Sequence, residues 1–264
     1  MDIFRNEVRE GNFFYRYSCS RPWRTHEGER HHAHNLCELI YILRGDATHI
    51  IEGRRYRLSR GDLVLVRPRR YHDIFFEGER EYERYNILFD IEGMGLWRAA
   101  EVTERFEVIS LADRPMTAAI FPRMEAYRAA LPPEEFAEAA KHLLFTLFYD
   151  LSLLPSEEGR RHTSAHPMLT EALAYIRENL FTVRDVAEIA AALHVTESYL
   201  FRIFRTELNT GPARYVTEKR LLAAQRMMHL GRRPSEVFSE CGFQDYTAFF
   251  RAYKKFFGTS PSKG

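Results

Sequence analysis

The first 110 residues contain short runs of β-branched and aromatic side chains that are separated by turn-forming residues. The runs that predict strands are 38–43, 47–52, 63–66, 73–76 and 84–89. Turns are predicted at Gly45-Asp46, Glu52-Gly53 and Arg60-Gly61-Asp62. Short strands at such regular spacing are typical of antiparallel sheets, so we expect residues 1–110 to form an antiparallel β-barrel or jelly roll.

The hydrophobic spacing changes after residue 111, where apolar positions begin to follow the helical period. A helix of about twenty residues is predicted from Pro133. Its apolar face consists of Phe136, Ala139, Ala140, Leu143, Leu144, Leu147, Phe148, Leu151 and Leu154. Such a face has to be buried, so the segment 111–155 is expected to pack on the barrel or to form a dimer contact with the same helix of a second chain. Pro155 ends the helix, and the polar residues 156–165 predict a linker.

Two short helices joined by a tight turn are predicted between Asp185 and Arg205. Asp185 and Glu188 occupy the N-cap and N3 positions of a capping box, and Thr196 can cap the second helix. The side chains at core-facing spacing are Val186, Ile189, Ala190, Leu193, Leu200, Ile203 and Phe204. The opposite face of the second helix carries Ser198, Phe201, Arg202 and Arg205. Ala190 is small enough for a close helix crossing, so the stretch predicts a helix-turn-helix unit.

The same pattern returns between residues 235 and 257. Gly242 supplies a turn, Asp245 an N-cap, and the residues that follow form an apolar helix in which Arg251 corresponds to Arg202. We therefore expect residues 166–264 to form an all-helical domain with two helix-turn-helix units. The fold class is accordingly α+β with several domains: a β-barrel, a helical segment, and this C-terminal domain.

These two units, closed by Gly258-Thr259-Ser260-Pro261, resemble the AraC/XylS family of transcriptional regulators over about the last hundred residues. By family position, the base-contacting side chains are Ser198, Phe201 and Arg202 in the first unit and Tyr246, Thr247, Phe250 and Arg251 in the second. Arg202 and Arg251 are the strongest candidates, because guanidinium binds guanine O6 and N7 in a bidentate manner. Arg205 and Lys254 are expected to contact phosphates.

The second unit departs from the family pattern at its helix crossing. Phe238 occupies the position that corresponds to Ala190, so we expect this unit to open slightly or its helices to cross at a different angle. Arg233 also replaces the usual N-cap residue, although Pro234 suits the first helical position.

A second resemblance lies in the β-rich half. His32-Ala33-His34, Glu38 and Gly45 match H-x-H-x₃-E-x₆-G, which resembles the first motif of the cupin superfamily, and His72 ends a degraded second motif. Members of the AraC family often carry a cupin-like sensing domain at this end of the chain. The resemblance thus implies a ligand-sensing barrel, with sugars as the suggested ligand class.

The chemistry of this residue set follows from strand geometry. Residues two apart on a strand share a face, so His32 and His34 are expected to point into the barrel beside Glu38 and His72. Three imidazoles and a carboxylate suit a divalent transition metal with open coordination positions. The same histidines can instead hydrogen-bond to an organic ligand, or form a buried polar group without a ligand.

Length, charge and cysteine count narrow the class of protein. A chain of 264 residues is long enough for two domains with sizeable cores. The N-terminus carries charges where a signal peptide needs an apolar run, and no stretch approaches a membrane span, so we expect a cytoplasmic protein. From His166 onward, 14 Lys and Arg face 10 Asp and Glu, so DNA binding would depend on locally placed cations. Three cysteines without paired spacing predict reduced thiols.

Together these observations predict a sequence-specific DNA-binding transcriptional regulator that is controlled by a small ligand in the barrel. The expected partners are double-stranded DNA, the small-molecule effector, a second copy in a homodimer, and RNA polymerase if the protein is an activator; no membrane is expected. One alternative is an enzyme in which His32, His34, Glu38 and His72 hold iron or manganese. Another is a redox-sensing regulator that acts through Cys19 or Cys37.

Overall fold

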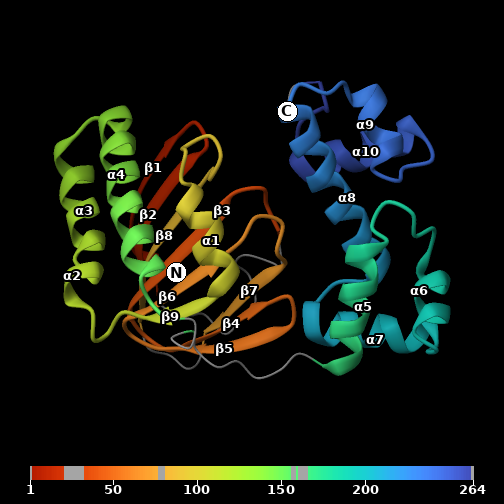
Figure 1. Ribbon diagram of the computed structural model, residues 1–264, viewed down its shortest axis with the longest axis horizontal. Coiled ribbons are helices and arrows are strands. Elements are labelled where there is room, and N and C mark those ends of the chain that lie inside the picture. The colour runs from red at the N-terminus through yellow and green to blue at the C-terminus, as the bar shows by residue number, and fades with distance from the viewer. Residues whose placement is uncertain (1, 21–32, 77–80, 156–158, 160–165, 263–264) are drawn as a thin grey trace. The chain divides into compact units, whose positions relative to one another are not determined.

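The computed structural model describes residues 2–20, 33–76, 81–155, 159 and 166–262. The chain divides into two compact units, Met1–Thr163 and Ser164–Gly264 (Figure 1). Over the described residues the first unit combines antiparallel sheets with helices, and the second contains helices alone. The predicted fold class, a β-rich N-terminal domain followed by a helical C-terminal domain, is therefore confirmed.

Two sheets form the framework of the first unit. The larger one contains, in spatial order, β1 (Asp2–Glu10), β2 (Phe13–Ser20), β8 (Tyr82–Phe89), β3 (Cys37–Arg44), β6 (Asp62–Val66) and β9 (Val108–Ser110). The smaller one contains β5 (Arg54–Leu58), β4 (Ala47–Ile51) and β7 (His72–Phe76). All of these pairings are antiparallel.

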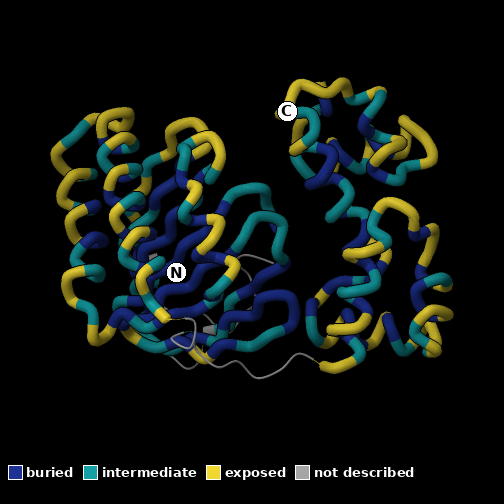
Figure 2. Tube along the Cα trace, in the orientation of Figure 1, coloured by how far each residue is buried: buried dark blue, intermediate teal, exposed yellow. Residues whose placement is uncertain are grey.

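Alternate residues of the central strands face opposite sides of the larger sheet. Tyr15, Leu39 and Ile87 belong to a core that the sheet shares with helices, whereas Ile40 and Ile42 belong to a second core shared with the smaller sheet. Because both faces are covered, the central strands are buried almost continuously (Figure 2). Strands buried on both sides lose the alternation of polar and apolar residues, which explains the apolar runs in β3 and β6.

Helices cover one face of the larger sheet (Figure 1). They are α1 (Trp97–Arg105), α2 (Pro115–Ala118), α3 (Ile120–Ala130) and α4 (Pro133–Ser152). The apolar face of α4 is buried in its own chain, through Phe136, Ala140, Leu143, Leu144, Leu147, Phe148 and Leu151. Of the two expectations for this face, packing on the β-domain is the one observed, so the face is not available to a second chain.

The sequence patterns predicted no individual strand at β1 or β2 and no helix at α1. β1, with the sequence DIFRNEVRE, shows no regular alternation of polar and apolar residues and lies at the edge of the larger sheet, and β2 pairs with both β1 and β8. α1 falls between two strands of the same sheet. Its apolar stripe is short, with Ala99 and Val102 buried, so the hydrophobic pattern gives little helical signal there.

The second unit consists of α5 (Pro167–Glu178), α6 (Val186–Ala192), α7 (Glu197–Leu208), α8 (Pro212–His229), α9 (Pro234–Glu240) and α10 (Tyr246–Phe257). The long helix α8 joins the two helix-turn-helix units, α6–α7 and α9–α10. Its buried side chains include Leu221, Leu222 and Ala224, so it contributes to the cores on which both units rest.

Candidate functional site

The first helix-turn-helix unit begins with two side-chain caps. The Asp185 carboxylate accepts a hydrogen bond from the Glu188 amide at 2.9 Å, and the Thr196 hydroxyl accepts one from the Tyr199 amide at 3.2 Å. The reciprocal half of the predicted capping box differs, because Glu188 accepts from the amide of Arg184 at 3.1 Å rather than from that of Asp185. The Glu188 carboxylate also pairs with the Arg184 guanidinium, which explains why it binds the backbone of Arg184 instead of that of the N-cap residue.

The second helix of this unit, α7, separates core-facing from solvent-facing residues as the spacing predicts. Leu200, Ile203 and Phe204 are buried. The candidate DNA-contacting residues Ser198, Phe201, Arg202 and Arg205 are all exposed, and Phe201 retains 44% of its surface. The Arg202 guanidinium lies 5.0 Å from the centre of the Tyr199 ring, one turn earlier on the helix. That contact supports the side chain while its polar atoms remain free to bind.

The second unit has the same plan but a different cap and turn. The Asp245 carboxylate accepts from two amides, those of Thr247 at 3.2 Å and Ala248 at 2.6 Å. The candidate residues on α10 lie on its outer side: Tyr246, Thr247, Arg251 and Lys254 are exposed, and Phe250 is half-buried. α9 begins at Pro234, and its N-cap residue Arg233 makes no side-chain cap, as expected from the sequence.

Phe238, at the crossing of α9 and α10, is accommodated by aromatic packing. Its ring lies 5.5 Å from that of Tyr246 at an interplanar angle of 83°, and 6.5 Å from that of Phe249. Phe243 adds an edge contact to Phe249 from the turn. The crossing is therefore filled by edge-to-face and tilted ring contacts instead of being closed by a small residue.

One arginine links the two units from α8. The Arg220 guanidinium donates to the carbonyls of Leu180 at 2.7 Å, Gly242 at 2.9 Å and Val183. Two of these carbonyls precede α6, and the third lies in the turn between α9 and α10. Gly242 has φ +79°, and a Cβ there would lie 2.5 Å from the Phe181 carbonyl oxygen. The turn therefore requires glycine, both for its backbone conformation and for the close approach of neighbouring atoms.

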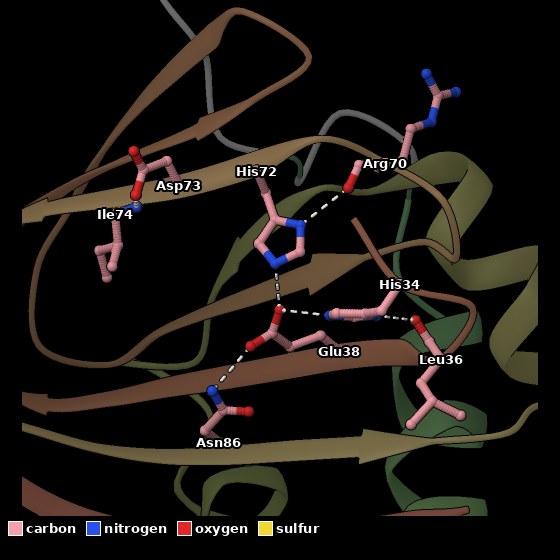
Figure 3. Close-up of polar contacts among 8 residues, drawn as sticks. All are labelled: His34, Leu36, Glu38, Arg70, His72, Asp73, Ile74 and Asn86. Atoms are coloured by element: carbon pink, nitrogen blue, oxygen red, sulfur yellow. Dashed lines mark hydrogen bonds and ion pairs between the residues drawn. The ribbon is translucent and has the colours of Figure 1, made fainter. Parts of the chain in front are cut away.

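A buried polar cluster lies between the two sheets of the first unit, and it contains three of the four predicted cupin-type residues (Figure 3). Glu38 Oε2 lies 2.6 Å from His72 Nε2 and 3.4 Å from His34 Nε2. Glu38 Oε1 accepts a hydrogen bond from Asn86 Nδ2 at 2.8 Å. The fourth predicted residue, His32, lies outside the described residues.

The hydrogen bonds of this cluster define the protonation of its rings. Nδ1 of His34 donates to the Leu36 carbonyl, and Nδ1 of His72 donates to the Arg70 carbonyl, each at 2.9 Å. A neutral ring would then present a bare Nε2 lone pair to Glu38, so a proton or a metal ion is needed between them. Burial acts to raise the pKa of Glu38, but positive charge on His72 and the hydrogen bonds from both histidines outweigh it and hold this pKa well below 4.5.

Two members of this site carried no motif signal. Asn86 is a single amide within the apolar strand β8, and it is 3% exposed. His49 on β4 is buried, and its ring stacks on that of His72 at 5.9 Å. Both side chains could have been found only from the pairing register of their strands, which places them on the face that points between the sheets. The sequence alone does not give that register.

The cysteines give no support to the redox alternative. Cys19, Cys37 and Cys241 are buried, and no disulfide joins them. Burial raises the pKa of the Cys37 thiol, and Glu38 adds to that shift, so the reactive thiolate is disfavoured.

A β-domain with an enclosed polar cluster, joined in one chain to two helix-turn-helix units, is the organisation of a DNA-binding transcriptional regulator with its own ligand-binding domain. The family model described as AraC-like ligand binding domain matches residues 17–148, and that of a helix-turn-helix domain matches residues 189–263. The chain belongs to the AraC family of transcriptional regulators, which confirms the resemblance found in its sequence.

Proteins to which the chain is similar include two curated proteins and one solved structure. The transcriptional activator RhaR of Cronobacter sakazakii is 24% identical over 252 residues, which cover 87% of this chain and 84% of RhaR. The raffinose operon regulatory protein RafR of Pediococcus pentosaceus is 30% identical over 122 residues, or 46% of this chain and 44% of RafR. ToxT of Vibrio cholerae, solved with a bound unsaturated fatty acid, aligns over 96% of this chain and 95% of its own at 11% identity and a TM-score of 0.40.

RhaR and RafR are both named as regulators of transcription. Among the helices that the structure describes, none has the length and apolar composition needed to cross a bilayer.

Proposed function

We propose that this protein binds DNA through α7 and α10 and that a small effector in the β-domain controls this binding. The observation that carries the proposal is that one chain combines two helices bearing exposed arginines with a cavity of about 550 Å³ in its other unit, which Glu38 and Asn86 help to line. An effector that binds one state of the β-domain better than another shifts the population toward that state, and can thereby change DNA affinity.

The base-contacting roles follow from exposure and chemistry. Arg202 and Arg251 are exposed at equivalent positions of α7 and α10, and each can bind the O6 and N7 atoms of a guanine. Ser198 and Thr247 can reach base or sugar edges, and the exposed ring of Phe201 can contact a thymine methyl group. Tyr246 and Phe250 offer similar contacts from α10, while Arg205 and Lys254 suit phosphate oxygens.

The regulatory part of the proposal is tested with the full chain and a DNA duplex selected for binding to it. Fluorescence anisotropy would measure DNA affinity with and without each compound that binds the β-domain, for wild type and for Glu38→Gln. We expect at least one compound to change DNA affinity severalfold in wild type, by a typical coupling of about 1–3 kcal/mol, and not in the variant. If every bound compound leaves DNA affinity unchanged, the regulatory coupling fails.

A divalent transition metal is a second candidate for the β-domain site, favoured by the protonation pattern of its histidines. One ligand atom each from His34, Glu38 and His72 lies within 4.8 Å of the other two, and Nδ1 of both histidines donates to a backbone carbonyl. Histidine ligands of metals usually have such a second contact, which orients the ring, so this residue set fits a metal. A bound metal would supply open coordination positions for an effector's oxygen atoms.

Elemental analysis tests the metal directly. Untagged wild type should carry about one equivalent of a transition metal, and His72→Ala should lose it. His142→Ala, which removes an exposed histidine on α4, is the matched control and should retain the metal. Metal-free wild type after growth with zinc, iron and manganese would leave the cluster as a hydrogen-bonding site for an organic effector.

The remaining parts of the proposal concern assembly and location. We propose a homodimer that forms through exposed apolar side chains near the ends of α1 and α4, where Trp97 is 66% and Leu153 84% exposed. As a regulator without catalytic activity, it would work in the cytoplasm, where bacterial DNA lies, and would contact RNA polymerase if it activates. Sedimentation of wild type beside Trp97→Ser/Leu153→Ser tests the dimer, since a monomeric wild type contradicts it.

A further inference from the structure

The cavity of the first unit extends from the Glu38 cluster toward the edge of the larger sheet. It has a volume of about 550 Å³, and its polar lining comes from four strands and one turn. The lining residues that matter here are Arg9, Asn12, Phe14, Arg16, Glu38 and Asn86. The cavity therefore has guanidinium groups at one end and a carboxylate with an amide at the other.

Strand register explains why these side chains share one face. In the antiparallel ladder Arg9 lies opposite Phe14 on the neighbouring strand, and Arg16 lies opposite Asn86. Side chains of directly opposed residues project to the same side of a sheet. Glu38 comes from β3, on the far side of β8, and reaches Asn86 by the 2.8 Å hydrogen bond.

The two arginines form the cationic end of the cavity. Their Cζ atoms lie 5.2 Å (Arg9) and 4.9 Å (Arg16) from the centre of the same Phe14 ring. Arg16 Nε is 3.3 Å from a carboxylate oxygen of Glu7, and its side chain is only 16% exposed. Glu7 is shared with Arg5, whose guanidinium lies 2.7 Å from the same carboxylate oxygen, and among the described residues Arg9 has no carboxylate partner. An anionic group is the partner that this excess of positive charge favours.

The other end of the cavity favours hydrogen-bond donors. Asn86 Nδ2 donates to Glu38, which leaves its Oδ1 as the acceptor, and this buried atom accepts no hydrogen bond from the described residues. A buried acceptor without a donor is costly, so a hydroxyl group supplied by a bound molecule would be stabilising. Asn12, in the turn between β1 and β2, adds a second amide to the lining.

We propose that the effector bound here is a small anionic polyol, such as a sugar acid or a sugar phosphate. Its acidic group binds Arg9 and Arg16, its carbon skeleton lies against Phe14, and its hydroxyl groups bind Asn86 and Glu38. This inference rests on the proposed function, because it names the effector class of the β-domain. It narrows the expectation of a sugar to one that carries a negative charge.

Calorimetric titration of the full-length protein tests the proposal with matched compounds. The acids are D-galacturonate, D-glucuronate, D-gluconate and D-galactose 6-phosphate; the controls are D-galactose, which lacks the charge, and hexanoate, which lacks the hydroxyl groups. We expect at least one acid to bind tenfold or more tightly than both controls. Comparison of the carboxylates with the phosphate then identifies which anion the arginines accept.

Two variants and one control locate the contact. Arg9→Gln and Arg16→Gln should each weaken binding of the acid by roughly 10- to 100-fold, as expected for loss of a charge-assisted hydrogen bond. Arg123→Gln removes an exposed charge on α3, outside the cavity lining, and should retain wild-type affinity. Asn86→Ala should weaken the acid and leave the weak binding of hexanoate unchanged.

Three results would overturn the inference: no acid binds, galactose or hexanoate binds as tightly as the acids, or the Arg9 and Arg16 variants keep wild-type affinity. If galactose binds as tightly as the acids and changes DNA affinity, this inference fails and the proposed regulation stands. If an acid binds through the arginines without changing DNA affinity, this inference stands and the proposed regulation by that acid fails.

Discussion

The two helix-turn-helix units have the same order of helices, yet different side chains hold them together. In α6–α7 the crossing is made by the small residue Ala190, and the core around it is mainly aliphatic. In α9–α10 the aromatic ring of Phe238 occupies the corresponding place and packs against Tyr246 and Phe249. The same order of helices can therefore be held by either a small residue at the crossing or a set of packed aromatic rings.

The turns of the two units differ in a related way. His194 adopts the left-handed conformation with φ 54° in the first turn, where the second has Gly242 with φ 79°. The second turn also has one more residue before its cap, because the N-cap follows Gly242 by three positions and His194 by two. Among the described hydrogen bonds, Arg220 donates to the second turn, at Gly242, and to no residue of the first turn. Substitutions at the two turns should therefore affect stability differently.

The largest effect is expected for Arg220→Met. The substitution leaves the carbonyls of Leu180, Val183 and Gly242 without their donor, and should lower the free energy of unfolding of the second unit by about 3–5 kcal/mol. Arg226→Met, an exposed change on the same helix, should cost much less. Urea unfolding followed by circular dichroism at 222 nm measures both. Equal effects would show that Arg220 does not link the units.

Glycine substitutions at the turns should have opposite signs. Gly242→Ala should destabilise the C-terminal helical domain by about 2–3 kcal/mol, because the new Cβ meets the Phe181 carbonyl in a left-handed backbone. His194→Gly should stabilise the same domain by about 0.5–1 kcal/mol, because glycine relieves the strain of the left-handed conformation. Both tryptophans precede residue 164, so tryptophan fluorescence should be unchanged while the helical signal shifts. Shifts of the same sign would contradict the comparison.

Exchange of the crossing residues tests the two packing solutions. Ala190→Phe should cost about 1–3 kcal/mol by overpacking a close crossing. Phe238→Ala should cost a similar amount for the opposite reason, since it leaves a cavity beside Tyr246 and Phe249. Phe238→Leu is the matched control and should recover part of the loss. A neutral Phe238→Ala in thermal unfolding would mean that the ring contributes no packing.

The smallest destabilising effects are expected at the helix caps. Asp245→Ala should cost about 1–2 kcal/mol and Asp185→Ala about 1 kcal/mol, because the first carboxylate accepts two amide hydrogen bonds and the second accepts one. Asp→Asn at each position keeps an acceptor and should be milder. Chemical unfolding would contradict this ranking if Asp185→Ala proved the more costly change.

The sequence predicted both helix-turn-helix units because their signals are local. Caps at Asp185, Thr196 and Asp245, and apolar residues at helical spacing, act within a few residues of one another. The consequence of Phe238 was not predictable, because where a ring packs depends on partners from another helix. Arg220 was also missed, since its three carbonyl partners are distant in sequence.

The β-domain shows the same limit. The motif spacing indicated His34, Glu38 and His72, which the structure brings together, whereas Asn86 and the arginines of the cavity depend on strand register. Register could not be assigned because β1 and β2 had not been identified as strands. Long-range pairing leaves little trace in a local pattern of residues.

The central claim is that both helix-turn-helix units of one chain recognise DNA sequence. The most direct test is to let the full-length protein select duplexes from a random pool. Wild type should select two sequence elements about one helical turn, roughly 34 Å, apart. Arg202→Ala should lose preference in one element and Arg251→Ala in the other, each by about 1–3 kcal/mol at one base pair. A single selected element that is insensitive to Arg251→Ala, or equal weakening on all sequences, would contradict the account.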